Sequence, residues 1–430
     1  MKKLKLSNET IDNILESLLK RSPNQYTQYE STVNDIVNAV REKGDDAVFA
    51  YTKQFDGADI NATNIVVTEE EIQEAYTKVP SELVEVIKKA LVNIEAYHAK
   101  QKQNSWFTSE EGIILGQKVA PLAKVGVYVP GGKAVYPSSV LMNVMPAKVA
   151  GVEKIYMTTP CDKNGKVNPS TLVAAKEAGV DVIYKCGGAQ AIAALAFGTE
   201  SIEKVDKIVG PGNIFVALAK KCVFGYVAID SIAGPSEILV LADDTANPTY
   251  VAADLLSQAE HDELASAILV TTSESLANKV EGEINRFVEI LSRKDIITKS
   301  LDNFGYLLIA DSKKDAYACV NAIASEHLEI VTENPFEDMT YIKNAGAIFL
   351  GQYSSEPLGD YFAGPNHVLP TNGTARFFSP LSVDDFIKKS SIISYSKEAL
   401  EAVYPDIVKF ANNEGLTAHA NSIKVRFESI

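Results

Sequence analysis

Apolar side chains in the first hundred residues of the chain fall mainly at helical spacing. This pattern runs from Asn8 to Arg21 and through the segment STVNDIVNAVREKGDDAVFAYTKQFD. It returns from Ser81 to Gln103, where a serine and an early glutamate mark the start of a long helix. The short apolar run IVVT, at residues 65–68, is a strand candidate. The pattern therefore predicts a mostly helical N-terminal region.

From Val119 onward, short and nearly continuous apolar runs alternate with helical segments. Such runs are typical of parallel strands that helices cover on both faces. One series extends from KVGVYV to YVAID, and a second begins at Glu237 with EILVLA. We therefore predict an α/β protein with two incomplete Rossmann-like lobes, each built on a parallel sheet. A helical N-terminal segment precedes the lobes, and a small helical C-terminal arm follows Pro380.

These patterns divide the chain into four predicted parts. Residues 1–25 form the N-terminal helical segment, and residues 26–124 together with 237–380 form the first α/β lobe. Residues 125–236 form the second lobe, and residues 381–430 form the helical arm. Because the arm is short for an independent domain, we expect it to pack on its own body or on a partner subunit.

The composition narrows the class of protein. The 41 Lys and Arg residues against 56 Asp and Glu residues give a net charge of −15, which argues against a nucleic-acid or anionic-membrane surface. The N-terminus lacks the apolar core of a signal peptide, and no apolar run approaches the roughly 20 residues that span a bilayer. We therefore expect a soluble cytoplasmic protein. Four cysteines without CxxC or zinc-finger spacing favour free, buried thiols: Cys161, Cys186, Cys222 and Cys319.

Histidine is scarce in this chain and lies beside carboxylates. Of the five histidines, His261 lies in SQAEHDE, His327 in SEHLE and His419 in EGLTAHANS, while His367 follows Asp360 in LGDYFAGPNH. Histidine ligates transition metals and transfers protons near neutral pH. Each of these residues alone is more often a surface or helix-end residue. Together they indicate a metal or acid–base site assembled from distant segments.

One histidine motif has a spacing that suits metal ligation. Gln258 and His261 are three residues apart on a predicted helix, so both project from one face. Asp360 and His419 would complete a set of nitrogen and oxygen donors that is typical of zinc or a similar divalent ion. Glutamine is an uncommon ligand, however, and an ordinary helix surface is the alternative.

An adjacent acid–base pair, Glu326 and His327, lies at a predicted helix end just before the strand LEIV. We expect functional groups at such strand–helix junctions of an open α/β sheet. The alternative is a histidine that interacts with the dipole of its own helix.

Glycine-rich turns form a further group of candidate binding elements. The turns YVPGGKAVYPSS, CGGAQAIAAL, VGPGN and AGPSE are each predicted to follow a strand, and all but the last to open a helix. Glycines in such turns allow close approach of a phosphate, which the helix N-terminus favours. None matches G-x-G-x-x-G or a P-loop, so ordinary tight turns explain them equally well.

Seven longer segments combine these motifs, in the order VYVPGGKAVYPSSVLMNVMPAKVAGV, CGGAQAIAALAFGTESIEKVDKIVGPGN, DSIAGPSEILVLAD, DLLSQAEHD, ASEHLEI, EPLGDYFAGPNHVLPT and GLTAHANS. Together they resemble the histidinol dehydrogenase family, and the resemblance covers nearly the whole chain. It implies oxidation of L-histidinol to L-histidinal and then to L-histidine, the last two steps of histidine biosynthesis. It also implies two NAD⁺ molecules and a zinc ion as cofactors.

The resemblance assigns roles to residues of this chain. The implied zinc ligands are Gln258, His261, Asp360 and His419, and the implied catalytic pair is Glu326 and His327. The implied substrate contacts are these six residues with Ser236, His367 and Glu414. The implied NAD contacts are Tyr128, Gln190 and Asn213. In the family, the arm reaches into the partner of a homodimer, so Glu414 and His419 would complete the site of the other subunit.

The residue types suit this chemistry. His327 can take the hydroxyl proton as hydride leaves, and Glu326 can activate the water that adds to the aldehyde. Zinc would act as a Lewis acid or would position the substrate. The four cysteines lie outside the matched motifs around Glu326 and His327, so oxidation through a thioester is not supported.

Two alternative functions remain open at the level of sequence. One is a related zinc- and NAD-dependent dehydrogenase of another small alcohol, such as a sulfonated diol. Related proteins of that kind lack part of the set that contacts amine and imidazole, so the presence of His367 and Glu414 favours histidinol. The other is a metal-binding or scaffold protein without activity, which the intact Glu326 and His327 argue against.

Overall fold

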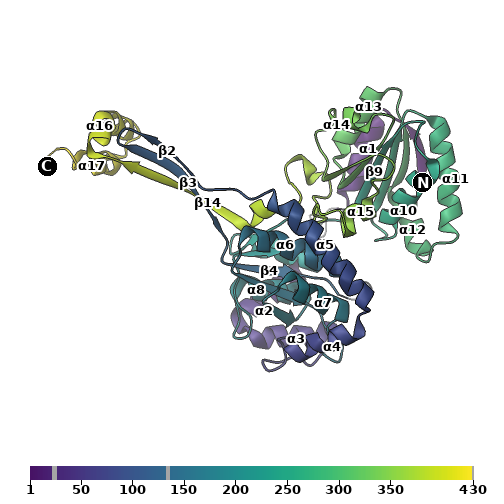
Figure 1. Cartoon of the computed structure of the whole chain (residues 1–430), viewed down its shortest axis with the longest axis horizontal. Coiled ribbons are helices and arrows are strands. Elements are labelled where there is room, and N and C mark those ends of the chain that lie inside the picture. The colour runs from purple at the N-terminus through teal and green to yellow at the C-terminus, as the bar shows by residue number, and fades with distance from the viewer. Residues whose placement is uncertain (22–26, 132–135, 429–430) are drawn as a thin grey trace. The chain divides into compact units, whose positions relative to one another are not determined.

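The computed structural model describes residues 1–21, 27–131 and 136–428. The chain forms two compact units. The larger unit combines Met1–Gln101 with Leu122–Phe386, and the smaller unit combines Lys102–Pro121 with Ile387–Ile430. The larger unit contains two parallel sheets with helices around them, as Figure 1 shows. The predicted α/β class with two parallel-sheet lobes is therefore confirmed.

The first parallel sheet has six strands in the order β1–β11–β10–β9–β12–β13. Its strands are β1 (Lys2–Lys5), β11 (Gly305–Ile309), β10 (Ser266–Thr271), β9 (Glu237–Ala242), β12 (His327–Val331) and β13 (Ala347–Leu350). The helices α1 (Asn8–Leu19) and α13 (Lys313–Ile323) pack on one face, and α10 (Pro248–Ala259), α11 (Glu274–Val288) and α12 (Lys294–Phe304) pack on the other. The central strands β9 and β10 are buried at every position, because helices cover both faces. Two short helices, α14 (Pro335–Met339) and α15 (Glu356–Tyr361), complete this lobe.

The second parallel sheet has five strands in the order β6–β5–β4–β7–β8. Its strands are β6 (Val182–Lys185), β5 (Lys154–Thr159), β4 (Lys124–Tyr128), β7 (Lys207–Val209) and β8 (Ala228–Ile229). The helices that follow its strands are α6 (Pro137–Ala150), α7 (Pro169–Ala178), α8 (Gly188–Phe197) and α9 (Ile214–Val223). The strand order reverses between β4 and β7, which is the switch point where such sheets usually bind ligands.

The N-terminal helices pack differently from the prediction. The helices α2 (Thr27–Lys43), α3 (Asp45–Asp56), α4 (Glu69–Lys78) and α5 (Ser81–Ala99) share one core with the five-stranded sheet, not with residues 237–380. The predicted grouping of residues 26–124 with 237–380 is therefore corrected. An amphipathic helix shows in its sequence which face is buried but not which sheet buries it.

The predicted N-terminal segment, residues 1–25, is also not purely helical. Lys2–Lys5 forms strand β1 at the edge of the six-stranded sheet, in parallel register with β11. All four residues of β1 are exposed, so the strand has no apolar pattern that would reveal it. Residues 22–25 lie outside the described part of the chain.

The smaller unit contains an antiparallel sheet that the sequence did not reveal. Strand β14 (Ile387–Tyr395) pairs with β3 (Ile113–Pro121), which pairs with β2 (Trp106–Glu110). The helices α16 (Lys397–Asn413) and α17 (Thr417–Lys424) follow β14. The predicted helical arm, residues 381–430, thus contains strand β14 after a short 3-10 helix, Val383–Phe386, and this strand shares its sheet with residues 106–121. Most positions of β2 and β14 are exposed, which hides the alternation typical of strands.

Two smaller expectations are also corrected. The run IVVT forms only an isolated bridge, between Val66 and Tyr184. Pro80 rather than Ser81 precedes the first turn of α5, without a side-chain capping bond. The turn AGPSE leads into β9 and opens no helix, as predicted. Among the described residues, no helix is long and apolar enough to cross a membrane.

The VGPGN turn shows why a glycine is needed between β7 and α9. Gly210 has a φ of 113°, and its N–H donates to Asp230 Oδ2 at 2.8 Å. A Cβ atom at Gly210 would overlap the carbonyl oxygen of Tyr128, at the end of the neighbouring strand β4. Gly225 also has a positive φ, of 102°, but no atom lies within 4 Å of the corresponding position.

We therefore expect Gly210→Ala to lower the free energy of unfolding by more than about 3 kcal/mol, because it adds a backbone clash to the strain of positive φ. Gly225→Ala carries the strain alone and should cost about 1 kcal/mol. Urea unfolding of both variants measures the difference. Equal losses would show that the close approach to Tyr128 is unimportant.

Candidate active site

The amino ends of two neighbouring strands of the six-stranded sheet carry the candidate catalytic groups. After α13, Ala324 has a left-handed backbone with φ 53°, and the chain then turns directly through Glu326 into His327, where β12 begins. Strand β9 lies beside β12 and begins at Glu237. The pair therefore lies at the amino edge of this sheet, opposite to the carboxyl edge that open α/β sheets normally use.

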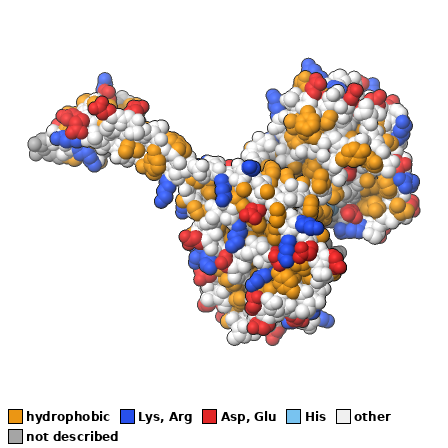
Figure 2. Space-filling view, in the orientation of Figure 1, with side chains coloured by type: hydrophobic (Ala, Val, Ile, Leu, Met, Phe, Trp, Pro, Cys, Tyr) orange, Lys and Arg blue, Asp and Glu red, His pale blue; other side chains and the backbone are white. Residues whose placement is uncertain are grey.

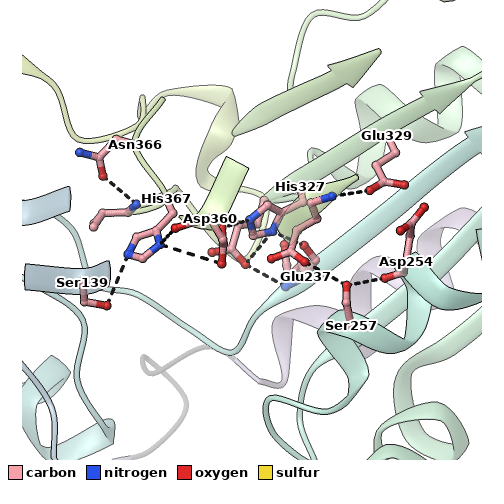
Figure 3. Close-up of polar contacts among 12 residues, drawn as sticks. Ser139, Glu237, Asp254, Ser257, His327, Glu329, Asp360, Asn366 and His367 are labelled. Carbon is pink, nitrogen blue, oxygen red and sulfur yellow. Dashed lines mark hydrogen bonds and ion pairs between the residues drawn. The ribbon is translucent and has the colours of Figure 1, made fainter. Parts of the chain in front are cut away.

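The backbone of Glu237 holds both catalytic side chains. Its N–H donates to Glu326 Oε2 at 2.9 Å, and its carbonyl oxygen accepts from His327 Nδ1 at 3.0 Å. Because a carbonyl can only accept, Nδ1 carries the proton, and the lone pair of neutral His327 lies on Nε2. Nε2 is 3.5 Å from Asp360 Oδ1, and Figure 3 shows His327 between Glu237 and Asp360.

Several carboxyl groups are buried around this imidazole. Burial raises the pKa of Glu326 to about 8, and it raises the pKa of Glu356 to about 8 with help from the neighbouring Asp360. Burial lowers the pKa of His327, but the carboxylates of Glu326 and Asp360 outweigh this effect and raise it above its ordinary value. The site therefore favours an added positive charge, either a proton or a metal cation.

The donor atoms of the site fit a divalent metal ion. Ligand atoms of His327, Glu356 and Asp360 all lie within 4.8 Å of one another. The Gln258 side chain is fully buried, yet neither its oxygen nor its nitrogen has a hydrogen-bond partner. Orphaned polar atoms of this kind are costly in a folded protein, so they point to a missing partner. Nitrogen and oxygen donors in this arrangement suit zinc.

The predicted helical spacing of Gln258 and His261 is only partly correct. Helix α10 ends at Ala259, so His261 lies beyond its last turn. Ser257, beside Gln258, donates to Glu356 Oε2 at 2.9 Å, which connects α10 to the acidic cluster. Partial burial lowers the pKa of the exposed His261, and the Asp360 carboxylate opposes this shift.

His367 and Ser139 extend the site toward the five-stranded sheet. His367 Nδ1 donates to the carbonyl oxygen of Asp360 at 3.1 Å, and its Nε2 is 3.4 Å from Ser139 Oγ (Figure 3). Ser139 lies in the first turn of α6, directly after the YVPGG turn. Ser236 is half-buried and immediately precedes Glu237 at the start of β9.

Two further predicted site residues lie in the smaller unit. Glu414 follows α16 and His419 lies in α17, so both belong to the smaller unit, where both are exposed. Glu237, Glu356 and Ser139 belong to the site but were not predicted from the sequence. Glu356 lies four residues before Asp360 on α15, and that helical spacing was a usable signal.

The three predicted NAD contacts lie at the carboxyl edge of the five-stranded sheet. Tyr128 ends β4, and its hydroxyl accepts from the N–H of Gly188, where α8 begins. Gln190 follows on α8 with a buried side-chain oxygen that has no partner. Asn213 caps α9 by accepting from the N–H groups of Phe215 and Val216. Asn213 therefore has a structural role whether or not it contacts a cofactor.

A cavity of about 620 Å³ opens at the carboxyl ends of β4 and β5. Its walls include Pro130 and Pro160 from the turns after these strands, and Asp56 from the end of α3. One carboxylate oxygen of Asp56 is buried without a hydrogen-bond partner, and burial raises the pKa of Asp56 to about 6. The first two strands of a nucleotide-binding sheet normally place the adenosine end of a dinucleotide at this edge.

One lobe has a sheet edge of the kind that binds nucleotides, and the other lobe holds a buried glutamate–histidine pair. Together these features define a two-lobed α/β dehydrogenase. The sequence model of the histidinol dehydrogenase family matches residues 19–427. The chain is 61% identical to the histidinol dehydrogenase of Clostridium acetobutylicum over 97% of this chain and 96% of that protein. It is 58% identical to that of Caldanaerobacter subterraneus subsp. tengcongensis over 96% of each. The chain therefore belongs to the histidinol dehydrogenase family.

The fold agrees with this assignment. The crystal structure of histidinol dehydrogenase from Elizabethkingia anophelis matches 99% of this chain and 98% of that chain, with a TM-score of 0.93 and 40% identity. The predicted family is thus confirmed, whereas the roles of the individual site residues stay predictions.

The buried Asp56 carboxyl gives a prediction about pH and stability. Because the pKa of Asp56 is raised, the folded state binds the Asp56 proton more tightly than the unfolded state does. This tighter proton binding stabilises the folded protein below about pH 4, and the stabilisation is lost as the pH rises through about 6. Asp56→Asn should therefore stabilise the protein progressively, relative to the natural chain, between these pH values. Urea unfolding at several pH values measures this difference.

The exposed Asp59, which pairs with Lys53, offers the matched control. Asp59→Asn should show no such trend. A pH-independent difference between Asp56→Asn and the natural chain would contradict the burial argument.

Proposed function

We propose that this site oxidises L-histidinol through L-histidinal to L-histidine in two successive NAD-dependent steps. The observation that supports this most directly is the enclosed pair Glu326 and His327, with a free Nε2 beside Asp360, in a chain of the histidinol dehydrogenase family. His367 supplies a further imidazole beside Asp360, as recognition of a substrate with an amine and an imidazole requires. NAD⁺ supplies the hydride acceptor in both steps.

His327 acts as the general base in both oxidations. Since Nδ1 donates to the carbonyl of Glu237, Nε2 receives the proton of the substrate hydroxyl as hydride leaves. The carbonyl contact also holds the ring in one tautomer and orientation. Asp360, at 3.5 Å, stabilises the imidazolium that forms.

Glu326 activates the water that the second step requires. The aldehyde must become a gem-diol before it can lose a second hydride, and a carboxylate with a raised pKa takes a proton from that water more readily. The N–H of Glu237 fixes one oxygen of Glu326, which leaves the other free for the water. The gem-diol then gives its proton to His327.

Gln258, His261, Asp360 and a partner-derived His419 would hold one zinc ion per site. A bound zinc ion would supply an anchor for the imidazole and amine of the substrate, and this anchor would keep the aldehyde bound between the two oxidations. Glu414 and Ser236 are the further substrate contacts that we assign. In the other lobe, Tyr128, Gln190 and Asn213 would contact NAD⁺, and the adjoining cavity has the volume for its adenosine part.

The smaller unit supports a homodimer with shared sites. Among the residues described up to 428, its helices bury three apolar residues, Val408, Ala411 and Ala420, in a cluster of their own. The strands and helix expose Trp106, Phe107, Ile393 and Phe410, and Figure 2 shows apolar side chains over this unit. Exposed apolar surface on so small a core is typical of an interaction surface. We infer that it docks on a second copy of the chain and delivers Glu414 and His419 there.

The first prediction of this proposal concerns turnover. The purified protein should convert L-histidinol to L-histidine with two NADH per molecule, and a sulfonated diol should not substitute. Exhaustive chelation should lower the rate at least about 100-fold, and added zinc should restore it. Full activity in protein that metal analysis shows to be metal-free would refute the zinc site. No turnover of histidinol by the zinc-loaded protein would refute the substrate.

A second prediction separates the two catalytic residues. His327→Asn should lower the rates of histidinol and histidinal oxidation alike, by about 10²–10⁴-fold. Glu326→Gln should impair histidinal oxidation far more, because only that step needs water. Stopped-flow measurement of NADH from each substrate tests this, with Glu333→Gln, an exposed glutamate beyond the other end of β12, as the control. Equal losses in both steps for Glu326→Gln would remove its role in water activation.

A third prediction concerns the shared site. Inactive His419→Ala chains are mixed with inactive His261→Ala chains and allowed to exchange subunits. A site built from two chains predicts partial recovery, because one site in each mixed dimer combines an intact His261 with an intact His419. If His419 served its own chain, every site would keep one defect. No recovery, with exchange confirmed by native mass spectrometry, would exclude the shared site.

A further inference from the structure

A buried ion pair joins the end of helix α1 to the first residue of β9. Arg21 Nη2 donates to Glu237 Oε1 at 2.5 Å, and Nη1 donates to the carbonyl oxygen of Leu264 at 2.7 Å. The guanidinium also lies over the ring of Phe304, 5.0 Å from its centroid. The side chains of Arg21 and Glu237 are only 1% and 3% exposed, so water does not screen the pair.

The energy of such a pair does not explain its presence. Burying two charges costs about as much as their attraction returns, so an apolar pair of similar volume usually stabilises a fold equally well. One oxygen of Glu237 and the Nε of Arg21 even lack hydrogen-bond partners. What an ion pair does provide, and an apolar pair does not, is a fixed direction and distance.

The residue that Arg21 holds is the one that orients the catalytic pair. The N–H and the carbonyl of Glu237 flank a single Cα, and they contact Glu326 and His327 respectively. A displacement of that Cα therefore moves the base and the water-activating carboxylate together.

The sheet holds this position from one side only. Glu237 is the first residue of β9, in register with Ser266, while His327 lies opposite Ile238. Residues 230–236, directly before Glu237, belong to no strand, and strand ends are the parts of a sheet that open most easily. The Arg21 contact thus restrains β9 at its amino end.

We propose that Arg21 and the side chain of Glu237 are positioning residues, which set the geometry of Glu326 and His327 without contacting the substrate. The effect on turnover rests on the function proposed above, whereas the effect on the geometry of His327 does not. Arg21→Met should lower kcat about 10–100-fold and change KM little, because a small displacement of a catalytic group costs rate rather than binding. Arg21→Lys keeps the charge but only one of the two hydrogen bonds, and should recover part of the loss.

The decisive variant combines Arg21→Met with Glu237→Met. It removes both charges, so it leaves no unpaired buried ion and should regain the stability that the single variant loses. If the pair positions the site, kcat stays low although stability returns. If kcat returns together with stability, the pair is merely structural and the proposal falls.

A control variant separates general destabilisation from positioning. Asp338 is buried in the same lobe and pairs with Lys313, Tyr317 and Thr332, beyond the opposite end of β12 from His327. Asp338→Asn should lower the melting temperature and leave kcat within about twofold. A loss of kcat in Asp338→Asn equal to that of Arg21→Met, at the same melting temperature, would overturn the proposal.

A spectroscopic measurement tests positioning without any substrate. The chain has five histidines, so ¹⁵N-labelled histidine gives few imidazole signals, and His327→Asn identifies the signal of His327. The natural chain should show the Nδ1 proton of His327 in a fixed hydrogen bond to the carbonyl of Glu237, and both the single and the double variant should show this signal shifted or broadened. An unchanged His327 signal in the stable double variant would refute positioning. If instead the natural chain fails to oxidise histidinol but the signal changes as expected, only the proposed function fails.

Discussion

Buried negative charge at the amino edge of the six-stranded sheet is the constraint on which the rest of the site depends. Glu326, Glu356 and Asp360 are enclosed around a single imidazole, and they cannot all ionise without a counter-charge. His327 supplies part of that charge when it is protonated, and a bound cation would supply the rest. The same constraint explains why the side chain of Gln258 can remain buried with both polar atoms unpaired in the protein alone. The site therefore favours a protonated His327 and a bound cation.

The sequence revealed those parts of the fold that are buried on both faces. Strands such as β9 and β10 are continuous apolar runs, so the two parallel sheets were predictable. Strands β1 and β2 are exposed along their whole length, and they carry no such pattern. The packing partner of a helix was equally hidden, because α2–α5 show an apolar face without showing which sheet covers it. Burial by a distant segment is a tertiary property that a local pattern cannot report.

For the candidate site, the chemistry was easier to predict than the geometry. The structure brings together four predicted residues, Glu326, His327, Asp360 and His367. They could be predicted because histidines are scarce in this chain and these ones lie in short motifs with carboxylates. The backbone of Glu237 could not be predicted as the group that holds the pair, since a peptide N–H and carbonyl have no sequence signature. The edge of the sheet was also misjudged, because a helix end just before a strand lies at the amino edge, whereas open α/β sheets normally place functional groups at the carboxyl edge. The residues of the smaller unit remain assigned by family resemblance.

The two lobes place their candidate sites at opposite edges of their sheets. This arrangement separates the partial negative and partial positive charges of the helix ends within the larger unit. In a parallel α/β layer each helix runs against its strands, so helix C-termini gather at the amino edge and helix N-termini at the carboxyl edge. Helices α10 and α13 end beside the acidic cluster, where partial negative charge favours a cation. Helices α8 and α9 begin at the edge where the pyrophosphate of a dinucleotide would lie, and where partial positive charge favours an anion. The same α/β arrangement therefore provides a partially negative environment for a metal at one sheet edge and a partially positive environment for a nucleotide at the other.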